Sequence, residues 1–304
     1  MKILITGANG FIGSFVVEKA LGRGWEVLGV VRKDSDLWRL QEIGFSEVRA
    51  INRYSEILEV MCDYKPDAVI HLAAYVKKHH VFDDAYILSD SIVSYTTVVL
   101  DAMRECGVNK LVYAGTSFEY GRDKEPHAIS DSLRPYDLYA ALKVAAEDVI
   151  RYYVDTYSLD AVVIRPFFVF GYRDNPNKLI PYMVRKALKG EEVDLTGGEQ
   201  ELDYIYVKDV ADIFLNAAIA DLRGFWVFNA GRGETITLRD MGRILEEIIG
   251  KTLPFRWGKR PYGDKEIMYL KADITAAVNY LKWRPSFDVR SGLEEVVAYY
   301  RDNL

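Results

Sequence analysis

Tyr139 and Lys143 stand four residues apart in a segment whose apolar spacing predicts a helix over residues 137–157. Residues at this separation share one face of a helix, so the phenol and the ammonium would lie together. A free tyrosine has a pKa of about 10, and a neighbouring positive charge favours the phenolate and lowers that pKa. We therefore expect Tyr139 to pass a proton to or from a hydroxyl group while a hydride moves at the same carbon.

Two hydroxyl side chains, Thr116 and Ser117, follow a short apolar run that predicts a strand over residues 110–114. Ligands of parallel α/β sheets bind outside the carboxyl ends of the strands. Either hydroxyl is therefore a candidate to hydrogen-bond the substrate oxygen that gains or loses the proton. The alternative for Thr116 is a purely local role, in which its hydroxyl closes the strand in a turn.

Three glycines, Gly7, Gly10 and Gly13, lie between a predicted strand at residues 2–6 and a predicted helix at residues 11–21. Glycine allows the tight turn and close backbone approach that a pyrophosphate needs, and the helix N-terminus offers N–H groups and partial positive charge. This order predicts a dinucleotide site; the alternative is a glycine-rich turn without a ligand. The candidate cofactor-binding residues of the loop are Gly7, Asn9, Gly10, Phe11, Ile12 and Gly13.

The end of the second predicted strand, residues 26–31, bears on which dinucleotide is bound. NAD-preferring sites usually place an acidic residue there for the ribose 2′-hydroxyl. Here the strand is followed by Arg32 and Lys33, and a guanidinium matches a 2′-phosphate well. We expect a preference for NADP(H), with NAD as the alternative. In that alternative, the two cations are ordinary solvated charges and Asp34 or Asp36 binds the ribose.

These candidate residues sit in a pattern of strands that alternate with helices. The alternation predicts βαβ units and, with right-handed crossovers, an α/β, doubly wound parallel sheet of the Rossmann type. The less regular second half predicts a smaller α/β substrate-binding lobe. The expected division is a dinucleotide-binding domain at residues 1–170, to which 203–230 return, and a substrate-binding lobe at 171–202 and 231–304. Further predicted strands lie at 67–72, 161–165 and 225–229, and further predicted helices at 91–106, 178–189, 208–220 and 292–301.

Composition and charge exclude several classes of protein. The chain has 304 residues, of which 50% are hydrophobic, a net charge of −6 and no long basic run, so we expect no nucleic-acid partner. No window is apolar for long enough to span a membrane, and the start of the chain does not read as a signal peptide. Cys62 and Cys106 lie far apart without metal-like spacing. We expect free thiols, a reducing cytoplasmic compartment and no metal site.

Together, the motifs resemble the extended short-chain dehydrogenase/reductase family, the NAD-dependent epimerases and dehydratases. The matching stretches are residues 6–13 (TGANGFIG), 71–74 (HLAA), 116–121 (TSFEYG), 139–143 (YAALK), 165–171 (RPFFVFG), 203–210 (DYIYVKDV) and 283–285 (WRP). The resemblance implies that Thr116, Tyr139 and Lys143 take the catalytic positions. It also implies that the cofactor is lined by Leu72, Ala73, Ala74, Tyr139 and Lys143.

The resemblance also implies a reaction. Residues 177–181, 196–206 and 264–268 are similar to nucleotide-sugar 4-ketoreductases of the CDP-abequose synthase kind. This implies NADPH-dependent reduction of a nucleotide-activated 4-keto-6-deoxy sugar, with Tyr139 as the proton donor. The alternative is a nucleotide-sugar 4-epimerase, of the UDP-glucose/UDP-galactose type, with tightly bound NAD. A more remote alternative is a non-catalytic dinucleotide-binding sensor of the same fold.

Several positions that relatives use for the substrate differ in this chain. The family usually has Asn where Phe168 stands and Arg where Leu202 stands, and both normally help to hold the substrate's phosphates. The acidic pair of sugar dehydratases is replaced by Ser117 and Phe118, so we do not expect dehydration. The candidate substrate-binding residues are Ser117, Phe168, Lys178 and Arg260.

The resemblance further implies a homodimer. In most relatives two helices pair across a two-fold axis, and the corresponding helices here are those predicted at residues 91–106 and 137–157. The alternative is that their apolar faces serve only the core of one chain. The expected partners are therefore a nucleotide-sugar substrate and a second copy of the chain.

Overall fold

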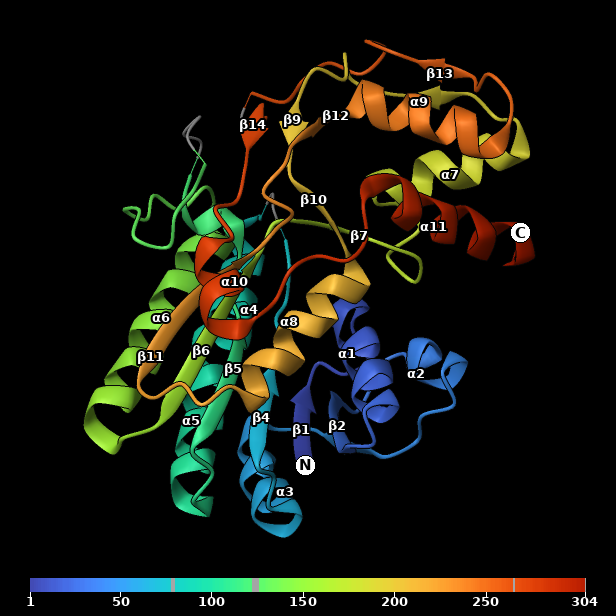
Figure 1. Ribbon diagram of the computed structural model, residues 1–304. Helices are drawn as coiled ribbons and strands as arrows, with labels where there is room; N and C mark the ends of the chain where they lie inside the picture. The colour runs from blue at the N-terminus through green and yellow to red at the C-terminus, as the bar shows by residue number, and fades with distance from the viewer. Residues whose placement is uncertain (78–79, 122–125, 265, 304) are drawn as a thin grey trace.

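The computed structural model describes residues 1–77, 80–121, 126–264 and 266–303 (Figure 1). Its main body is a seven-stranded sheet in the order β11-β6-β5-β4-β1-β2-β3, in which every neighbouring pair is parallel. The strands are β1 (Lys2–Thr6), β2 (Glu26–Arg32), β3 (Val48–Ile51), β4 (Ala68–His71), β5 (Lys110–Ala114), β6 (Asp160–Pro166) and β11 (Phe225–Ala230). The doubly wound parallel sheet that the sequence predicts is therefore confirmed.

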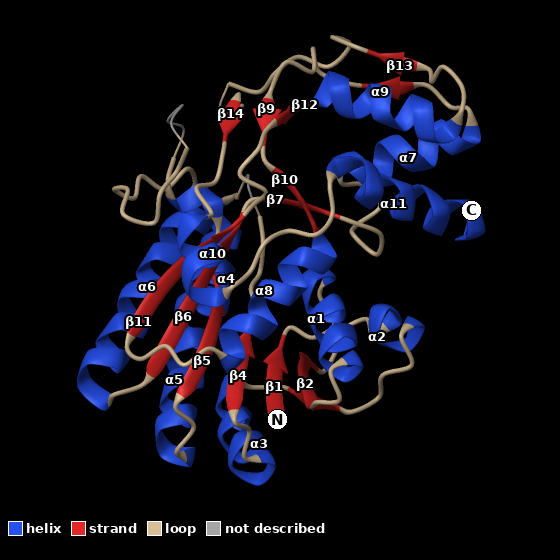
Figure 2. Cartoon of the chain, in the orientation of Figure 1, coloured by secondary structure: helices blue, strands red, loops and turns tan. Residues whose placement is uncertain are grey.

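Helices cover both faces of this sheet (Figure 2). The helices of one face are α1 (Phe11–Gly22) and α8 (Val207–Ile219), and those of the other face are α3 (Ile57–Tyr64), α5 (Tyr95–Cys106) and α6 (Leu138–Tyr157). Successive strand residues point to opposite faces, so Ile3 and Ile5 join the core under α1 and α8, whereas Leu4 joins the other core. Because both faces are buried, the central strands are apolar over most of their length.

A second group of elements lies beyond the carboxyl ends of the central strands (Figure 1). Its helices are α7 (Leu179–Lys189), α9 (Leu238–Ile249) and α11 (Val289–Asn303), and α11 packs against both of the others. Its small sheets pair β12 (Ile236–Thr237), β9 (Glu201–Leu202) and β14 (Tyr269–Leu270), then β13 (Phe255–Arg256) with β8 (Val193–Asp194), and β10 (Tyr204–Tyr206) with β7 (Phe168–Phe170). Within residues 203–230, α8 and β11 belong to the main body, whereas β10 pairs with β7. The exact domain division stays a prediction.

Most predicted elements agree with the observed ones to within two residues. The strand predicted at 110–114 is β5, and the helix predicted at 137–157 is α6, whose N-cap Asp137 accepts a hydrogen bond of 2.8 Å from the N–H of Ala140. β3 and α3 were not predicted. β3 is an edge strand whose two central residues are exposed, so it lacks an apolar run. The remaining elements are α2 (Trp38–Glu42), α4 (Phe82–Ser89), α10 (Thr275–Leu281) and short helical turns at Tyr54–Glu56, Asp90–Ser94 and Ser117–Glu119.

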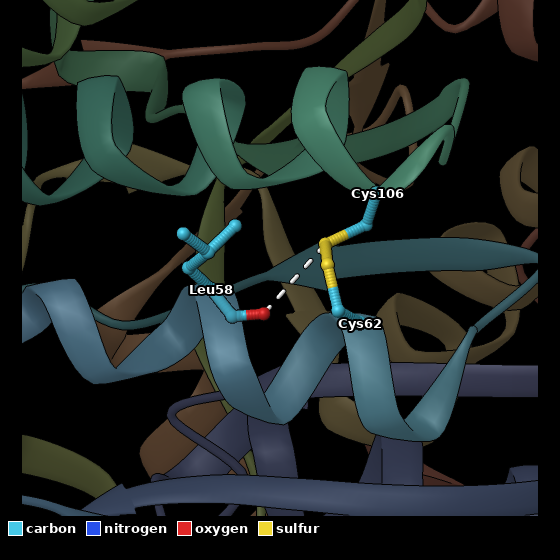
Figure 3. Close-up of a disulfide and its surroundings, with 3 residues drawn as sticks. All are labelled: Leu58, Cys62 and Cys106. Carbon is cyan, nitrogen blue, oxygen red and sulfur yellow. Dashed lines mark hydrogen bonds between the residues drawn. A yellow bond between two sulfur atoms is a disulfide. The ribbon is translucent and has the colours of Figure 1, made fainter.

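The two cysteines form a disulfide, which corrects the prediction of free thiols (Figure 3). Cys62 of α3 and Cys106 of α5 have Cα atoms 5.1 Å apart, and Sγ of Cys106 lies 3.6 Å from the main-chain oxygen of Leu58. The prediction was wrong because 44 residues separate the two positions and only the packing of α3 against α5 brings them together. Disulfides persist in oxidising compartments and inside hyperthermophilic cells. A reducing cytoplasmic location therefore stays a prediction.

Candidate active site

The glycine loop between β1 and α1 is too tight for any side chain at two of its positions. Gly7 has φ +69°, and a Cβ there would lie 2.8 Å from the main-chain nitrogen of Ala73. A Cβ on Gly13 would lie 2.1 Å from the carbonyl oxygen of Gly7. Gly10 is the N-cap of α1 and provides no side-chain cap, so the N–H groups of the first turn are open to an anion. The loop therefore fits a pyrophosphate group.

A cavity of about 550 Å³ opens at the carboxyl ends of β2 and β3. β2 is the neighbour of β1, the strand that leads into the glycine loop. It is lined by Arg32, Lys33, Asp34, Ile51, Asn52, Arg53, Tyr54 and Asp90. Arg32 and Lys33 thus lie where a dinucleotide's adenosine ribose is expected. Asp34 also lines the cavity, whereas the carboxylate of Asp36 accepts the N–H of Trp38 at 3.0 Å. Both acidic alternatives for ribose binding stay predictions.

Arg53 is a third cation of this cavity, and the sequence analysis missed it. It follows β3, a strand with no apolar run, so no sequence signal placed it beside the end of β2. The register of these two parallel strands sets Arg32 opposite Ile51, one residue before the stretch Asn52–Tyr54 that lines the cavity. Together the three cations give the cavity a positive side.

Leu72, Ala73 and Ala74 follow β4, and the first two lie against Gly7 of the glycine loop. That the three residues line the cofactor stays a prediction. The N–H of Leu72 donates to the carbonyl of Thr6 at 3.2 Å, and the Thr6 hydroxyl lies 3.4 Å from the main-chain nitrogen of Ala73. His71, just before them, is fully buried with its ring nitrogens 2.5 Å from the Thr6 hydroxyl and 3.1 Å from that of Thr96. Burial lowers the pKa of His71 to about 3, so the ring is neutral.

Tyr139 and Lys143 face the carboxyl end of β5. Lys143 is 1% exposed, and its Nζ donates a hydrogen bond of 2.7 Å to the carbonyl of Ala114. The same Nζ lies 4.5 Å from the ring centre of Tyr113 and 5.8 Å from that of Tyr139. Burial lowers the pKa of Lys143 to about 8. The helix face predicted from the four-residue spacing thus brings the two side chains together at the sheet edge.

The pKa of Tyr139 is shifted in the direction opposite to the expected one. Burial of the phenol raises its pKa above the ordinary value, and the carboxylates of Glu119 and Asp137 raise it further. The predicted lowering by Lys143 is therefore wrong for the protein alone, because desolvation disfavours the phenolate and the buried lysine gives up much of its own charge near pH 8. The phenol is protonated at neutral pH.

Thr116 occupies the turn after β5 and is 9% exposed. Its hydroxyl oxygen accepts the N–H of Phe118 at 3.3 Å, and its own N–H donates to Oε1 of Glu119 at 2.7 Å. The local turn that was the alternative for Thr116 is thus present, and it leaves the hydroxyl hydrogen for another acceptor. Ser117 is 1% exposed, and its predicted substrate contact stays a prediction.

A buried charged cluster beneath this turn was not predicted. Arg165 of β6 lies 2.6 Å from a carboxylate oxygen of Glu119 and pairs with both oxygens of Glu147 at 3.1 and 2.5 Å. All three side chains are at most 3% exposed. Spacing gave no signal for it, since the three residues come from a turn, a helix and a strand.

The predicted substrate residues fall into two groups. Phe168 of β7 lies beside the Thr116 turn, with its ring centre 5.8 Å from that of Phe118. Lys178 is the N-cap of α7, and Arg260 donates to the hydroxyl of Tyr182, one turn into the same helix, at 3.2 Å. Lys178 and Arg260 are both exposed. The structure therefore brings the two cations to the start of α7, in the second group of elements.

The described residues contain no group of three or more His, Cys, Asp or Glu side chains that could hold a metal ion. In the same part of the chain, every helix is too short or too polar to cross a membrane.

The parallel sheet, the glycine loop and the tyrosine–lysine helix define an α/β oxidoreductase that uses a dinucleotide. The sequence model of the NAD dependent epimerase/dehydratase family matches residues 3–231, and the chain belongs to this family. It is therefore an NAD(P)-dependent enzyme, as the motifs predict. A UDP-glucuronate 4-epimerase of Thermodesulfobacterium geofontis is 31% identical over 317 residues, which cover 99% of this chain and 96% of the relative.

Solved structures of relatives have the same fold from end to end. A UDP-glucose 4-epimerase from Thermotoga maritima with UDP-glucose matches with a TM-score of 0.90 and 26% identity, covering 100% of this chain and 99% of that one. A Thermus thermophilus UDP-glucose 4-epimerase complex with NAD matches with a TM-score of 0.89 and 26% identity, covering 100% of both chains. These three relatives are 4-epimerases, the alternative of the sequence analysis, rather than the ketoreductases it put first.

Proposed function

We propose that the protein is a nucleotide-sugar 4-epimerase, which oxidises a sugar carbon and then reduces it again. The observation that carries this proposal is the meeting of Tyr139, Lys143 and Thr116 at the end of β5. The buried His71 lies between these residues and the glycine loop. Its ring hydrogen-bonds the hydroxyl of Thr6, and the positive charge of Lys143 contributes to its lowered pKa. The names of relatives that match over the whole length support the reaction and a UDP-linked sugar.

In this proposal Tyr139 takes the proton from the sugar's 4-hydroxyl, and Thr116 donates its free hydroxyl hydrogen to the same oxygen. A bound dinucleotide supplies the hydride acceptor and donor, and its positive charge when oxidised favours the Tyr139 phenolate. Lys143, fixed on the carbonyl of Ala114, adds positive charge on that side. The keto sugar then rotates in the site, and Tyr139 returns the proton to the 4-oxygen as hydride reduces the opposite face of the same carbon.

The substrate's diphosphate would be held by Lys178 and Arg260. Lys178 is the N-cap of α7, and Arg260, from the loop after β13, is held by its hydrogen bond and ring contact with Tyr182 of α7. Arginine offers a planar set of donors that suits phosphate oxygens. This assignment compensates for the Asn and Arg that relatives have where Phe168 and Leu202 stand.

The second candidate function is the NADPH-dependent ketoreductase, and one observation favours it. Arg32, Lys33 and Arg53 all line the cavity at the ends of β2 and β3. Three cations there suit the 2′-phosphate of NADP(H), the cofactor that a net reductase consumes. An epimerase retains its cofactor and does not need to select NADP(H) over NAD. We therefore propose NADP(H) binding for this cavity and test it separately from the reaction.

We retain the homodimer as a proposal. α6 carries Tyr152 and Tyr157 with 55% and 40% of their surfaces exposed, and their ring centres lie 6.0 Å apart, so they form an aromatic surface that a second copy would cover. Sedimentation velocity decides this directly: we expect a single species of twice the chain mass, and a monomer at micromolar concentration would overturn it.

The reaction is tested by incubating the purified protein with UDP-glucose or UDP-glucuronate and separating the products by chromatography and NMR. We expect the 4-epimer to form without net change in nicotinamide absorbance. Net oxidation of NADPH by a nucleotide-linked 4-keto-6-deoxy sugar, without epimerisation, would instead establish the ketoreductase. The non-catalytic sensor is supported only if a Tyr139→Phe variant matches the wild type in every turnover assay.

The cofactor is tested by mass spectrometry of ligands released on denaturation and by titration with NAD and NADPH. Removing Arg32 and Lys33 together should weaken NADPH binding about 10- to 100-fold, since hydrogen bonds to charged groups contribute about 1.5–3 kcal/mol. NAD binding should change little. Arg49→Ala, which removes an exposed cation of β3 outside the cavity, is the matched control. Equal losses for both dinucleotides would refute a 2′-phosphate site.

A further inference from the structure

Beneath the Thr116 turn, two carboxyl groups and one guanidinium converge on a single point. A Cβ built on Gly115 would lie 3.0 Å from Oε1 of Glu119, 3.1 Å from Oε1 of Glu147 and 3.0 Å from Cγ of Arg165. Glu119 is 0% exposed, and the side chains of the other two are 3% exposed. The cluster is therefore sealed from water and must balance its charge internally.

Within these three side chains, the single guanidinium does not balance both acids if both are ionised. Arg165 is always charged and pairs with Glu147 through two hydrogen bonds, at 3.1 and 2.5 Å. Nε of Arg165 also lies 2.6 Å from Oε2 of Glu119, so two carboxyl groups share one guanidinium in a dry site. The Glu119 carboxyl group, whose Oε2 faces Arg165, also lies within hydrogen-bonding reach of the Glu147 carboxyl group. Two carboxyl groups form such a bond only when one of them carries a proton.

Burial and the neighbouring Glu147 both raise the pKa of Glu119, in agreement with this charge count. The other titratable groups that face the cluster are Tyr139 and Lys143 of α6, Tyr113 of β5 and Tyr120 after the turn. A negative charge on Glu119 raises the pKa of Tyr139 and so opposes formation of its phenolate. A protonated Glu119 removes this opposition at the proposed acid–base group.

The other oxygen of Glu119 has a different task. Oε1 accepts the N–H of Thr116 at 2.7 Å and so fixes the backbone of the residue whose hydroxyl is proposed to hold the substrate oxygen. This N–H lies at the junction of β5 and a single helical turn. A protonated carboxyl group keeps a carbonyl oxygen that can accept a hydrogen bond. Glu119 can therefore carry a proton and still accept the N–H of Thr116.

We propose that Glu119 is a positioning residue that anchors Thr116 through Oε1 and shares a single proton with the Glu147 carboxyl group, which keeps the cluster neutral beside Tyr139. The consequence for catalysis rests on the proposed function. The proton and the anchor are properties of the folded chain and are tested without any substrate.

The proton is tested by infrared difference spectroscopy in D₂O. The wild type should show the carbonyl stretch of a buried protonated carboxyl group at neutral pH. The band should vanish in Glu119→Gln, where the remaining acid, Glu147, is ionised by its pairing with Arg165. It should also vanish in Glu147→Gln, where Glu119 must ionise to pair with Arg165. Glu294→Gln, which changes an exposed carboxylate of α11, is the control and should keep the band. A wild type without the band, or a band that survives in either cluster variant, overturns the shared proton.

The anchor is tested by amide hydrogen exchange at Thr116. Exchange should accelerate in Glu119→Ala, which removes the acceptor, and stay near the wild-type rate in Glu119→Gln, which keeps an oxygen in place. Unchanged exchange in Glu119→Ala overturns the anchoring role. Neither this result nor the infrared result depends on turnover, so they stand apart from a failure of the proposed reaction.

If the enzyme turns over a nucleotide sugar, Glu119→Ala should lower kcat about tenfold to a hundredfold with KM nearly unchanged, because a displaced Thr116 affects the reacting geometry more than binding. Glu119→Gln should recover most of this loss. A merely structural role would lower both variants alike or change KM, and either result would contradict positioning.

Discussion

Breaking the Cys62–Cys106 disulfide should lower the stability of the chain while leaving the sheet edge that carries the active site intact. The bond joins α3 to α5 and closes a loop of 44 residues that contains β4 and the stretch after it. That stretch is also held by Thr6, whose main chain and hydroxyl contact Leu72 and Ala73 independently of the disulfide. Opening the loop therefore changes mainly the unfolded state, which gains freedom.

The magnitude follows from the length of the loop. For a separation of 44 residues, the loop-closure relation gives about 13 cal/mol/K, or about 4 kcal/mol at 25 °C. The entropy of unfolding at about 2.1 cal/mol/K per residue amounts to about 640 cal/mol/K for 304 residues. Dividing the free energy of about 4 kcal/mol by this entropy of unfolding predicts that the Tm falls by roughly 6 °C when the bond is removed.

Calorimetry of three samples measures this fall: the oxidised wild type, the wild type with dithiothreitol, and a variant with both Cys62 and Cys106 changed to alanine. The second and third should melt at similar temperatures, and the variant should not respond to the reductant. Alkylation under denaturing, non-reducing conditions counts free thiols, and we expect none. Two alkylated cysteines in the untreated protein, or an oxidised wild type that melts with the variant, would refute the reasoning.

Three further outcomes follow from the site. Gly13→Ala should abolish dinucleotide binding, because the new Cβ would lie 2.1 Å from the carbonyl oxygen of Gly7, whereas Gly22→Ala, whose Cβ meets nothing within 4 Å, should bind normally in titrations. Tyr139→Phe should lower kcat by about 100- to 10,000-fold with unchanged cofactor affinity, and steady-state kinetics that match the wild type would remove it as the acid–base group. The free energy of unfolding should fall as pH drops from 6.5 towards 3, since the unfolded chain protonates His71 there and the folded chain does not; about 3.5 pKa units correspond to roughly 5 kcal/mol. In denaturant titrations, His71→Asn should lose this part of the slope, and an unchanged slope would count against the buried neutral ring.

The elements that the sequence predicted well are those with a strong local pattern. β5 and α6 each bury one continuous run or one helical face, so their residues carry the period of the element in the sequence itself. β3 shows the opposite case, because an edge strand with two exposed central residues has no such period. Missing β3 also meant missing Arg53, whose place in the cavity depends on the pairing of β3 with β2.

The candidate site divides in the same way. The glycine loop and the Tyr139–Lys143 pair could be predicted, because each lies within a few residues of chain and its chemistry depends on that spacing. The pKa of Tyr139 could not be predicted, since its sign is decided by burial and by Glu119, which comes from another element. Local motifs also could not separate the reactions that occur within the family. The relatives that match over the whole chain favoured the 4-epimerase.

By itself, the sequence determined the alternation of strands and helices, the dinucleotide loop and the catalytic pair, because helix and strand periods and tight glycine turns are properties of neighbouring residues. Only the tertiary structure decided which distant groups meet. The disulfide joins residues 44 positions apart, and the cluster under Thr116 combines a turn, a helix and a strand. Such contacts depend on how elements pack against one another, and desolvation, which sets the charges at the active site, exists only after that packing has occurred.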